Sequence, residues 1–157
     1  MNFIIDRFIK HLSTMKRCSY VRNNNLPKDF HKSFSSKEDL CKQIFQQRYN
    51  IKMEKVRPLF LKFEETRGRL EFDGFNRDVQ TKVGRGLAFE YNGPQHYFKN
   101  YQNKYSSAQL RTIYRHDQLK KNYCKHHGIA LITIPYNVNK SQIVDYIHKR
   151  MTALFDI

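Results

Sequence analysis

The stretch GLAFEYNGPQHYF, residues 86–98, joins a strand pattern to a group of polar side chains. Alternation along a strand places two sets of side chains on opposite faces: Leu87, Phe89 and Tyr91 on one, and Ala88, Glu90 and Asn92 on the other. Gly93 and Pro94 mark a turn, and Gln95 and His96 follow it. A strand end with a purely structural role does not need a carboxylate, two amides and an imidazole. The pattern therefore indicates a site that holds a metal ion and a water.

A second strand pattern precedes this one. In RLEFDGF, residues 69–75, alternation puts Glu71 and Asp73 on the face opposite to the apolar side chains. Turn residues in NRDVQTKVGRG, residues 76–86, connect the two patterns, which predicts a β-hairpin. Because the two strands of a hairpin are adjacent and antiparallel, we expect Asp73 and Glu90 to lie on neighbouring strands.

The rest of the chain supplies helices and further strands. In chain order we expect a helix that starts at Ser35 or Ser36 with the capping-box pair Ser35 and Glu38, an edge strand at 57–63, a helix at about 107–127 that ends at Gly128, a buried strand at 129–136 and a final helix opened by Asn139 and Gln142. The order α-β-β-β-α-β-α predicts an α/β domain with a central mixed β-sheet flanked by helices. This domain is expected at 35–157, after an N-terminal helix and linker at 1–34.

The charge of the chain indicates its class of partner. Of its 157 residues, 29 are Lys or Arg and 14 are Asp or Glu, which gives a net charge of +15 and a pI near 9.9. A domain this basic usually meets a polyanion. Nucleic acid is the leading candidate, and a membrane surface is the second.

The N-terminal segment and the cysteines bear on localisation. Residues 1–17 have apolar side chains at helical spacing with basic residues between them, which predicts an amphipathic helix packed on the domain. A mitochondrial presequence is the alternative, although Asp6 counts against it. The chain has no apolar run of the ~20 residues that span a membrane. The three cysteines, Cys18, Cys41 and Cys124, form no CxxC motif, so we expect a reduced, intracellular protein that does not enter the membrane.

Two carboxylates and a histidine form the predicted site. Asp73 and Glu90 can converge on one Mg²⁺ or Mn²⁺ ion, since magnesium sites often use one or two carboxylates with water and phosphate oxygens. His96 follows the turn directly and can act as general base or general acid. Lys120, on the helix at 107–127, can reach a phosphate. The structural alternative is that both carboxylates are surface acids paired with some of the many lysines.

These residues resemble a known family. The segments LEFDGF, LAFEYNGPQHY and RHDQLKKNYCKHHGIALITIPY are similar in order and spacing to the PD-(D/E)XK nuclease superfamily. Within it, they resemble the branch around very-short-patch-repair (Vsr) and homing endonucleases, and uncharacterised viral proteins with the same motifs. The resemblance covers roughly residues 35–136. It implies a restriction-endonuclease-like core and Mg²⁺-dependent hydrolysis of phosphodiester bonds in DNA, with double-stranded DNA as the expected partner. The N-terminal segment at 1–34 is expected to add DNA contacts.

The resemblance also implies roles for individual residues. By that reading, Glu38 takes the place of the helix glutamate, Asp73 of the strand aspartate, Glu90 of the next carboxylate and His96 of the histidine. The family motif then has Asp, Arg, Leu and Gly at a fixed spacing, and the residues that match these positions are Asp117, Lys120, Cys124 and Gly128. Asp73 and Glu90 are then the metal ligands, and Asp117 orients the ring of His96.

The sequence departs from the family pattern at Asn92. The superfamily has a lysine there, and the nearer branch has an aspartate. Asn92 can still bind a metal through its carbonyl oxygen or orient a water, while Gln95 or a lysine of the following helix compensates for the missing charge. We therefore expect a metal-dependent DNA endonuclease. The alternatives are a catalytically inactive nucleic-acid-binding protein on the same fold, and an RNA-directed protein that stacks unpaired bases on the aromatic stretch HYFKNYQNKY, residues 96–105.

Overall fold

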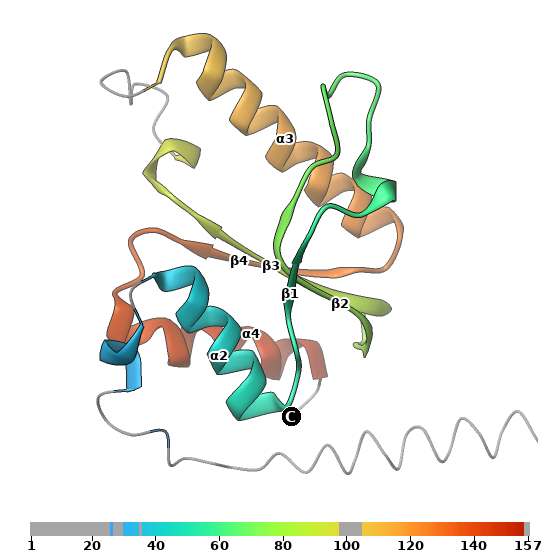
Figure 1. Cartoon of the computed structure of the whole chain (residues 1–157). Coiled ribbons are helices and arrows are strands. Elements are labelled where there is room, and N and C mark those ends of the chain that lie inside the picture. Colours follow the sequence, from blue (N-terminus) through green and yellow to red (C-terminus); the bar gives the residue numbers. More distant parts are fainter. Residues whose placement is uncertain (1–25, 27–29, 35, 98–104, 156–157) are drawn as a thin grey trace, which may run out of the picture.

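The fold is a four-stranded mixed sheet with helices on both faces, and the computed structural model describes residues 26, 30–34, 36–97 and 105–155 (Figure 1). Its elements in chain order are η1 (Phe30–Ser33), α2 (Lys37–Tyr49), β1 (Glu54–Val56), η2 (Leu59–Leu61), β2 (Phe72–Gln80), β3 (Arg85–Asn92), η3 (Pro94–His96), α3 (Ser107–His126), β4 (Ala130–Pro135), η4 (Lys140–Gln142) and α4 (Ile143–Phe155). The predicted α/β class, with a central mixed sheet flanked by helices, is confirmed. The predicted helix at 1–17 lies outside the described residues.

The sheet has the strand order β1-β2-β3-β4. Strands β2 and β3 pair antiparallel, with Gly74 opposite Phe89, so the predicted hairpin is confirmed. Strand β4 runs parallel to β3, from Leu87 opposite Ala130 to Asn92 opposite Pro135. Helix α3 makes the crossover between these two strands and covers one face of the sheet, while α2 and α4 cover the other (Figure 1).

Local sequence signals set the helix ends. The hydroxyl of Ser36 caps α2 by accepting the backbone N–H of Asp39, so the cap lies one residue later than the predicted Ser35 and Glu38 pair. Helix α3 begins with a complete capping box between Ser106 and Gln109. Both caps satisfy backbone N–H groups that the first turn leaves without partners.

The predicted edge strand at 57–63 is wrong. The edge strand is β1, at 54–56, and the chain then forms the 3₁₀ turn η2. Pro58 has no N–H to donate to a strand partner, whereas its carbonyl accepts the N–H of Leu61 at 3.1 Å. The turn buries Leu61 completely, which a continuing edge strand does not require. The hairpin turn is also shorter than the predicted 76–86, because the strands continue to Gln80 and resume at Arg85.

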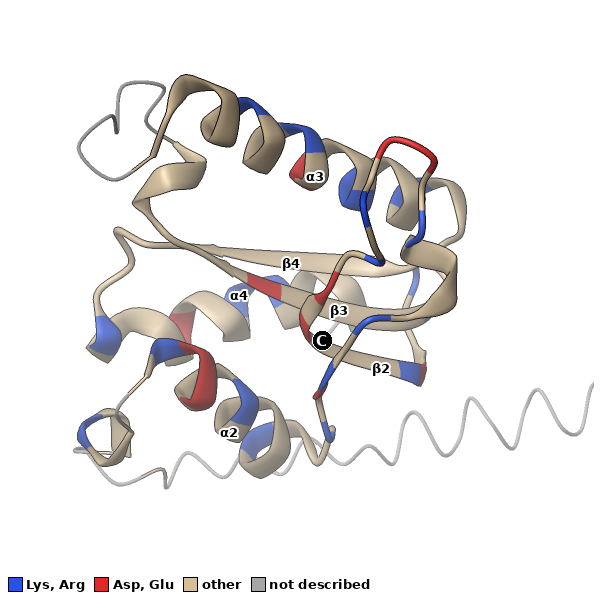
Figure 2. Cartoon of the chain, turned by 45° about the horizontal axis from the view of Figure 1, so that its top comes forward, with Lys and Arg blue, Asp and Glu red and all other residues tan. Residues whose placement is uncertain are grey.

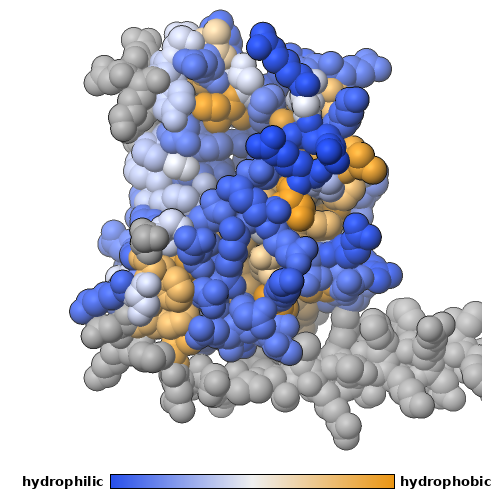
Figure 3. Space-filling model, in the orientation of Figure 1, coloured by the Kyte–Doolittle hydropathy of each residue, from blue (hydrophilic) through white to orange (hydrophobic). Residues whose placement is uncertain are grey.

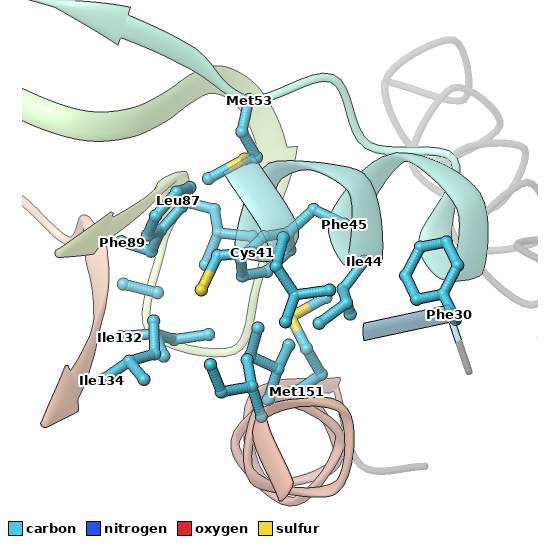
Figure 4. Packing of buried hydrophobic residues seen from close by; sticks show 14 residues of the cluster. Phe30, Cys41, Ile44, Phe45, Met53, Leu87, Phe89, Ile132, Ile134 and Met151 are labelled. Atoms are coloured by element: carbon cyan, nitrogen blue, oxygen red, sulfur yellow. The ribbon is translucent and has the colours of Figure 1, made fainter. Parts of the chain in front are cut away.

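Two apolar clusters fix the sheet between its helices. The larger one, between the sheet and helices α2 and α4, is formed by Phe30, Leu40, Cys41, Ile44, Phe45, Met53, Leu87, Phe89, Ala130, Ile132, Ile134, Ile143, Ile147 and Met151 (Figure 4). The smaller one, on the side of α3 and η2, is formed by Leu61, Leu70, Phe72, Ala88, Cys124 and Ile129. Leu87 and Phe89 thus face α2 and α4, and Ala88 faces α3, as the alternation in LAFEYN predicts. Phe30 is buried, so the described end of the predicted 1–34 segment packs on the domain.

Candidate functional site

A small pocket lies between helix α3 and strands β3 and β4. The side chains that line it are Glu90, Asn92, Asp117, Lys120, Lys121, Leu131 and Thr133. Alternation along β3 turns Glu90 and Asn92 towards α3, where Asp117 and Lys120 occupy its buried side. Residues far apart in the sequence are therefore brought together by the packing of one helix on two parallel strands.

Glu90 and Lys120 form a buried ion pair in this pocket. Lys120 Nζ lies 2.6 Å from Glu90 Oε2, and each side chain is 10% exposed. Lys120 also donates to the backbone oxygen of Glu71 at 3.2 Å, which holds its ammonium at the start of β2. Burial raises the pKa of Glu90 to about 7, and the nearby Lys120 ammonium opposes that shift. A lysine of α3 thus stands beside the buried Glu90 carboxylate.

Replacing Lys120 by Met is expected to lower the free energy of unfolding by about 3–5 kcal/mol near pH 8, because the Glu90 carboxylate is then buried without its partner. The raised pKa of Glu90 contributes stability that is present below its ordinary value of 4.5 and is lost as the pH rises through about 7. Loss of Lys120 raises this pKa further, so the variant is expected to be closer to the wild type near pH 5.

Urea unfolding of the Lys120→Met variant at both pH values measures this difference. The double variant Lys120→Met/Glu90→Gln is expected to recover most of the stability at the higher pH, because no charge is left buried. An equal loss at both pH values would show that Lys120 acts by packing alone.

Two buried oxygen atoms of the pocket have no hydrogen-bond partner among the described residues. They are Glu90 Oε1 and Asn92 Oδ1. Buried polar atoms are nearly always satisfied by protein groups, ordered water or a bound ion, so these two oxygens call for a partner. Carboxylate and amide oxygens are ligands that Mg²⁺ and other hard cations take in proteins. The residues present therefore fit a divalent cation at this end of β3.

His96 reaches the pocket through Asp117. The turn at Gly93 and Pro94 forms the 3₁₀ element η3, in which the N–H of His96 donates to the carbonyl of Gly93. His96 Nδ1 lies 2.5 Å from Asp117 Oδ2, and both side chains are largely buried. The ionised carboxylate accepts from Nδ1–H, which leaves Nε2 as the nitrogen that can exchange a proton with a bound group. The predicted contact between His96 and Asp117 is confirmed.

Asp73 belongs to a second charged group beside the pocket. Its Oδ2 accepts the backbone N–H of Tyr91 at 2.8 Å, which ties it to the strand that carries Glu90. Burial raises the pKa of Asp73, and the bond from Tyr91 partly opposes this shift. Asp73 also raises the pKa of Glu90, so the two carboxylates interact across the hairpin.

Lys55 of β1 lies among the acids of this second group. Its Nζ is 3.2 Å from Glu38 Oε2, 3.3 Å from Glu71 Oε1 and 3.9 Å from Asp73 Oδ1. Glu38, the predicted helix glutamate, is thus held by Lys55 and by Lys42 on its own helix. No sequence pattern singles out Lys55, because its three-residue strand is too short and too polar to show alternation.

The structure divides the predicted site residues into three sets. Those in the pocket are Glu90, Asn92, Asp117 and Lys120, with His96 attached through Asp117. Asp73 and Glu38 lie in the neighbouring group around Lys55. Gln95 lines neither: its side chain folds over Gly93, where an added Cβ would lie 2.4 Å from Gln95 Oε1. Thr133 lies opposite Glu90 on β4 and lines the pocket. It was not predicted as a site residue, although alternation along IALITIPY is a signal that could have identified it.

Two further observations limit the chemistry of the described part of the chain. No group of three or more His, Cys, Asp or Glu side chains is arranged there to hold a metal ion, so a cation at Glu90 needs additional oxygens from water or phosphate. Burial raises the pKa of the Cys41 and Cys124 thiols to about 12, which makes both poor nucleophiles.

No helix in the described ranges has the length and apolar character needed to cross a membrane.

Comparison with known proteins finds viral relatives. Uncharacterized protein 033L of Invertebrate iridescent virus 3 is 33% identical over 115 residues, which cover 73% of this chain and 56% of that protein. Uncharacterized protein 307L of Invertebrate iridescent virus 6 is 29% identical over 166 aligned residues, or 96% of this chain and 75% of that protein. Uncharacterized protein 094L of Frog virus 3 is 30% identical over 118 residues, or 74% and 71%.

The chain therefore spans little more than half the length of 033L and larger shares of the other two relatives. No protein-family model matches the sequence, and no solved structure matches it. The predicted resemblance to uncharacterised viral proteins is confirmed.

Proposed function

We propose that this chain, which belongs to the family of viral proteins that includes 094L of Frog virus 3, is a metal-dependent nuclease that hydrolyses phosphodiester bonds in DNA. The observation that carries the proposal is a pair of buried oxygens, Glu90 Oε1 and Asn92 Oδ1, that have no hydrogen-bond partner in the described part of the chain and lie in a pocket with the Lys120 ammonium. Oxygen ligands beside a fixed positive charge suit a cation and the phosphate it binds.

The metal would be Mg²⁺ or Mn²⁺, held by Glu90 and Asn92 with Asp73 close by. When bound, it would polarise the scissile phosphate and lower the pKa of a water molecule. Lys120 keeps Glu90 Oε2 in place and sets a positive charge where a phosphate oxygen would approach. Asp117 fixes the tautomer and orientation of His96, whose Nε2 takes a proton from water or gives one to the leaving oxygen.

The proposed fold family is the PD-(D/E)XK superfamily. The support is the order of the motifs and the placement of Asp73 and Glu90 on the two strands of one hairpin. The departure at Asn92 is offset by Lys120, which brings an ammonium to Glu90 from the helix. Restriction-endonuclease-like topology is thus part of the proposal, as is the assignment of roles within the site.

The test is a cleavage assay on supercoiled plasmid, single-stranded DNA and RNA, with and without Mg²⁺ or Mn²⁺. We expect cutting of DNA that requires the metal and stops on chelation. Cutting of RNA alone would change the substrate, and cutting without metal would contradict the site.

A nucleic-acid-binding protein without turnover is the second candidate. It is favoured by one observation: Lys120 already pairs with Glu90, so the carboxylate is compensated without a metal. The same assay distinguishes the two, because this candidate binds DNA but does not cut it under any metal condition. The RNA-directed alternative depends on residues 96–105, of which 98–104 lie outside the described residues.

Divalent metal affinity is expected to depend on pH through Glu90. The carboxylate must lose its proton to bind a cation, and its pKa is raised to about 7 by burial. The association constant for Mn²⁺ should therefore rise about tenfold from pH 5 to pH 6 and level off above about pH 8. Calorimetric titration with Mn²⁺ measures this, with Glu90→Gln as the reference. A flat profile would place the metal elsewhere.

A further inference from the structure

The outer face of α3 carries cations without acids. The helix turns its buried side chains, Leu110, Asp117, Lys120 and Cys124, towards the sheet. At 3.6 residues per turn, the side of the helix next to this buried one forms one continuous face made up of Arg111, Tyr114, Arg115, Gln118, Lys121, Asn122 and Lys125. The single acid of this helix, Asp117, is buried. Figure 2 shows the same distribution, with several basic segments along α3 and one acidic segment.

Most of these cations have no acidic partner. Arg115 Nη2 lies 3.6 Å from Glu65 Oε1, a long pair between largely exposed groups that contributes little. Among the described residues, no acid pairs with Arg111, Lys121 or Lys125. The positive charge of this face is therefore available to a partner.

The spacing of the charges is unfavourable for the helix itself. Arg111 and Arg115 are four residues apart, and so are Lys121 and Lys125, and like charges at this spacing repel each other on the helix surface. Helix α2 has the opposite arrangement at this spacing, with Glu38 and Lys42 paired at 2.7 Å. A surface helix selected for stability alone has no reason to place like charges in this way, whereas a polyanion bound along α3 offsets the repulsion.

This face leads into the pocket. Lys121 is exposed on α3 and also lines the pocket with Glu90 and Asn92. From Arg111 to Lys125 the cations extend over roughly 21 Å of helix, at 1.5 Å per residue. Figure 3 shows that hydrophilic residues cover most of the visible face of the molecule, while hydrophobic residues form separate patches.

We propose that the outer face of α3 binds the phosphate backbone of duplex DNA and brings one phosphate to the pocket past Lys121. The proposal rests on the nuclease function proposed above, and it names the surface and the substrate. A duplex is favoured over a single strand because this face carries four cations but one exposed aromatic, Tyr114, whereas single-strand grooves offer successive aromatic side chains for stacking.

The test compares two triple variants that remove equal charge. Arg111→Gln/Arg115→Gln/Lys125→Gln removes three of the four cations of the outer face of α3 and leaves every pocket residue, Lys121 included, in place. The matched control, Arg48→Gln/Lys149→Gln/Arg150→Gln, removes two arginines and one lysine from α2 and α4 on the other side of the sheet. Binding to a labelled 20-base-pair duplex is measured by fluorescence anisotropy in EDTA, so that no cleavage occurs, at several salt concentrations.

The α3 variant is expected to bind roughly 10²-fold more weakly near 0.1 M salt, and its slope of log affinity against log salt should fall by about 2.7, or 0.9 for each lost phosphate contact. The control should stay within about threefold of the wild type. Equal weakening of both variants would assign binding to overall charge and overturn the proposal. So would tighter binding of a single strand than of the duplex by the wild type. Because the assay needs no metal, a protein that binds through α3 but never cuts would refute the nuclease function and leave this surface standing.

Discussion

Replacing Glu90 by Gln is expected to abolish metal-dependent cleavage, with a fall in rate of about 10³-fold or more, since a bound divalent ion supplies several kcal/mol of transition-state stabilisation. The amide keeps the shape of the side chain, and its oxygen can still accept the hydrogen bond from Lys120. What it removes is the negative charge that holds a cation. Affinity for DNA should be unchanged or tighter, because a carboxylate that repels phosphate is gone.

Asp73→Asn should give the same result for a related reason. Its amide oxygen can still accept the N–H of Tyr91, so the strand contact is kept while the charge is lost. Single-turnover cleavage of plasmid in Mg²⁺ measures the rate of both variants, and anisotropy in EDTA measures binding. The matched control is Asp78→Asn, which removes a carboxylate from the same strand β2, where Asp78 is exposed and paired with Arg85. It should cut at the wild-type rate.

The two variants separate two versions of the site. If either cuts at a near-normal rate, the site with two carboxylate ligands is wrong. If only Glu90→Gln is inactive, the metal is held at the pocket by Glu90 and Asn92, and Asp73 acts through the neighbouring charged group around Lys55.

The elements predicted correctly are those with a strong local signal. Alternation in LAFEYN predicts the strand β3 and the division of its side chains between two faces, and the run IALITIPY predicts β4. Strand β1 has no such signal, because three residues with two charged side chains show no period. Strand β1 forms because it pairs with β2. The apolar run that follows β1 forms a turn that buries Leu61.

The candidate site shows the same division. The contact between His96 and Asp117 was expected from the family resemblance, whereas the turn after β3 and the length of α3 predict only the elements that carry the two residues. Burial of Lys120 was not expected, since a lysine in a basic helix is usually solvent-exposed. Only the register of α3 against β3 sets Lys120 over Glu90, and register between a helix and a sheet is a tertiary property. The group around Lys55 is hidden for a similar reason, because it joins residues of α2, β1 and the start of β2.

Replacing His96 by Ala is expected to lower the cleavage rate by roughly 10²–10⁴-fold, the usual contribution of a general acid or base. The reason is positional: Asp117 holds Nδ1 at 2.5 Å and leaves Nε2 to exchange a proton at the pocket. Metal binding should persist, because Glu90, Asn92 and Asp73 remain. Asp117→Asn should cost less than His96→Ala, since an amide oxygen still accepts from Nδ1–H and orients the ring. His126→Ala is the control, because this exposed histidine contacts only the backbone oxygen of Asn122 in the hydrogen bonds of the described residues.

Introducing a lysine with Asn92→Lys, as in the proposed PD-(D/E)XK pattern, in the His96→Ala background is the sharper experiment. Asn92 lines the same pocket as Asp117, so an ammonium there would stand near the proton-transfer position that His96 leaves. Recovery of cleavage would mean that the histidine and the lysine are alternative solutions to one chemical need, and calorimetry with Mn²⁺ would confirm that metal binding is not the cause. If His96→Ala instead cuts normally while Asn92→Ala or Gln95→Ala is inactive, the amides carry the chemistry. The histidine would then serve only to hold Asp117 and the start of the turn in place.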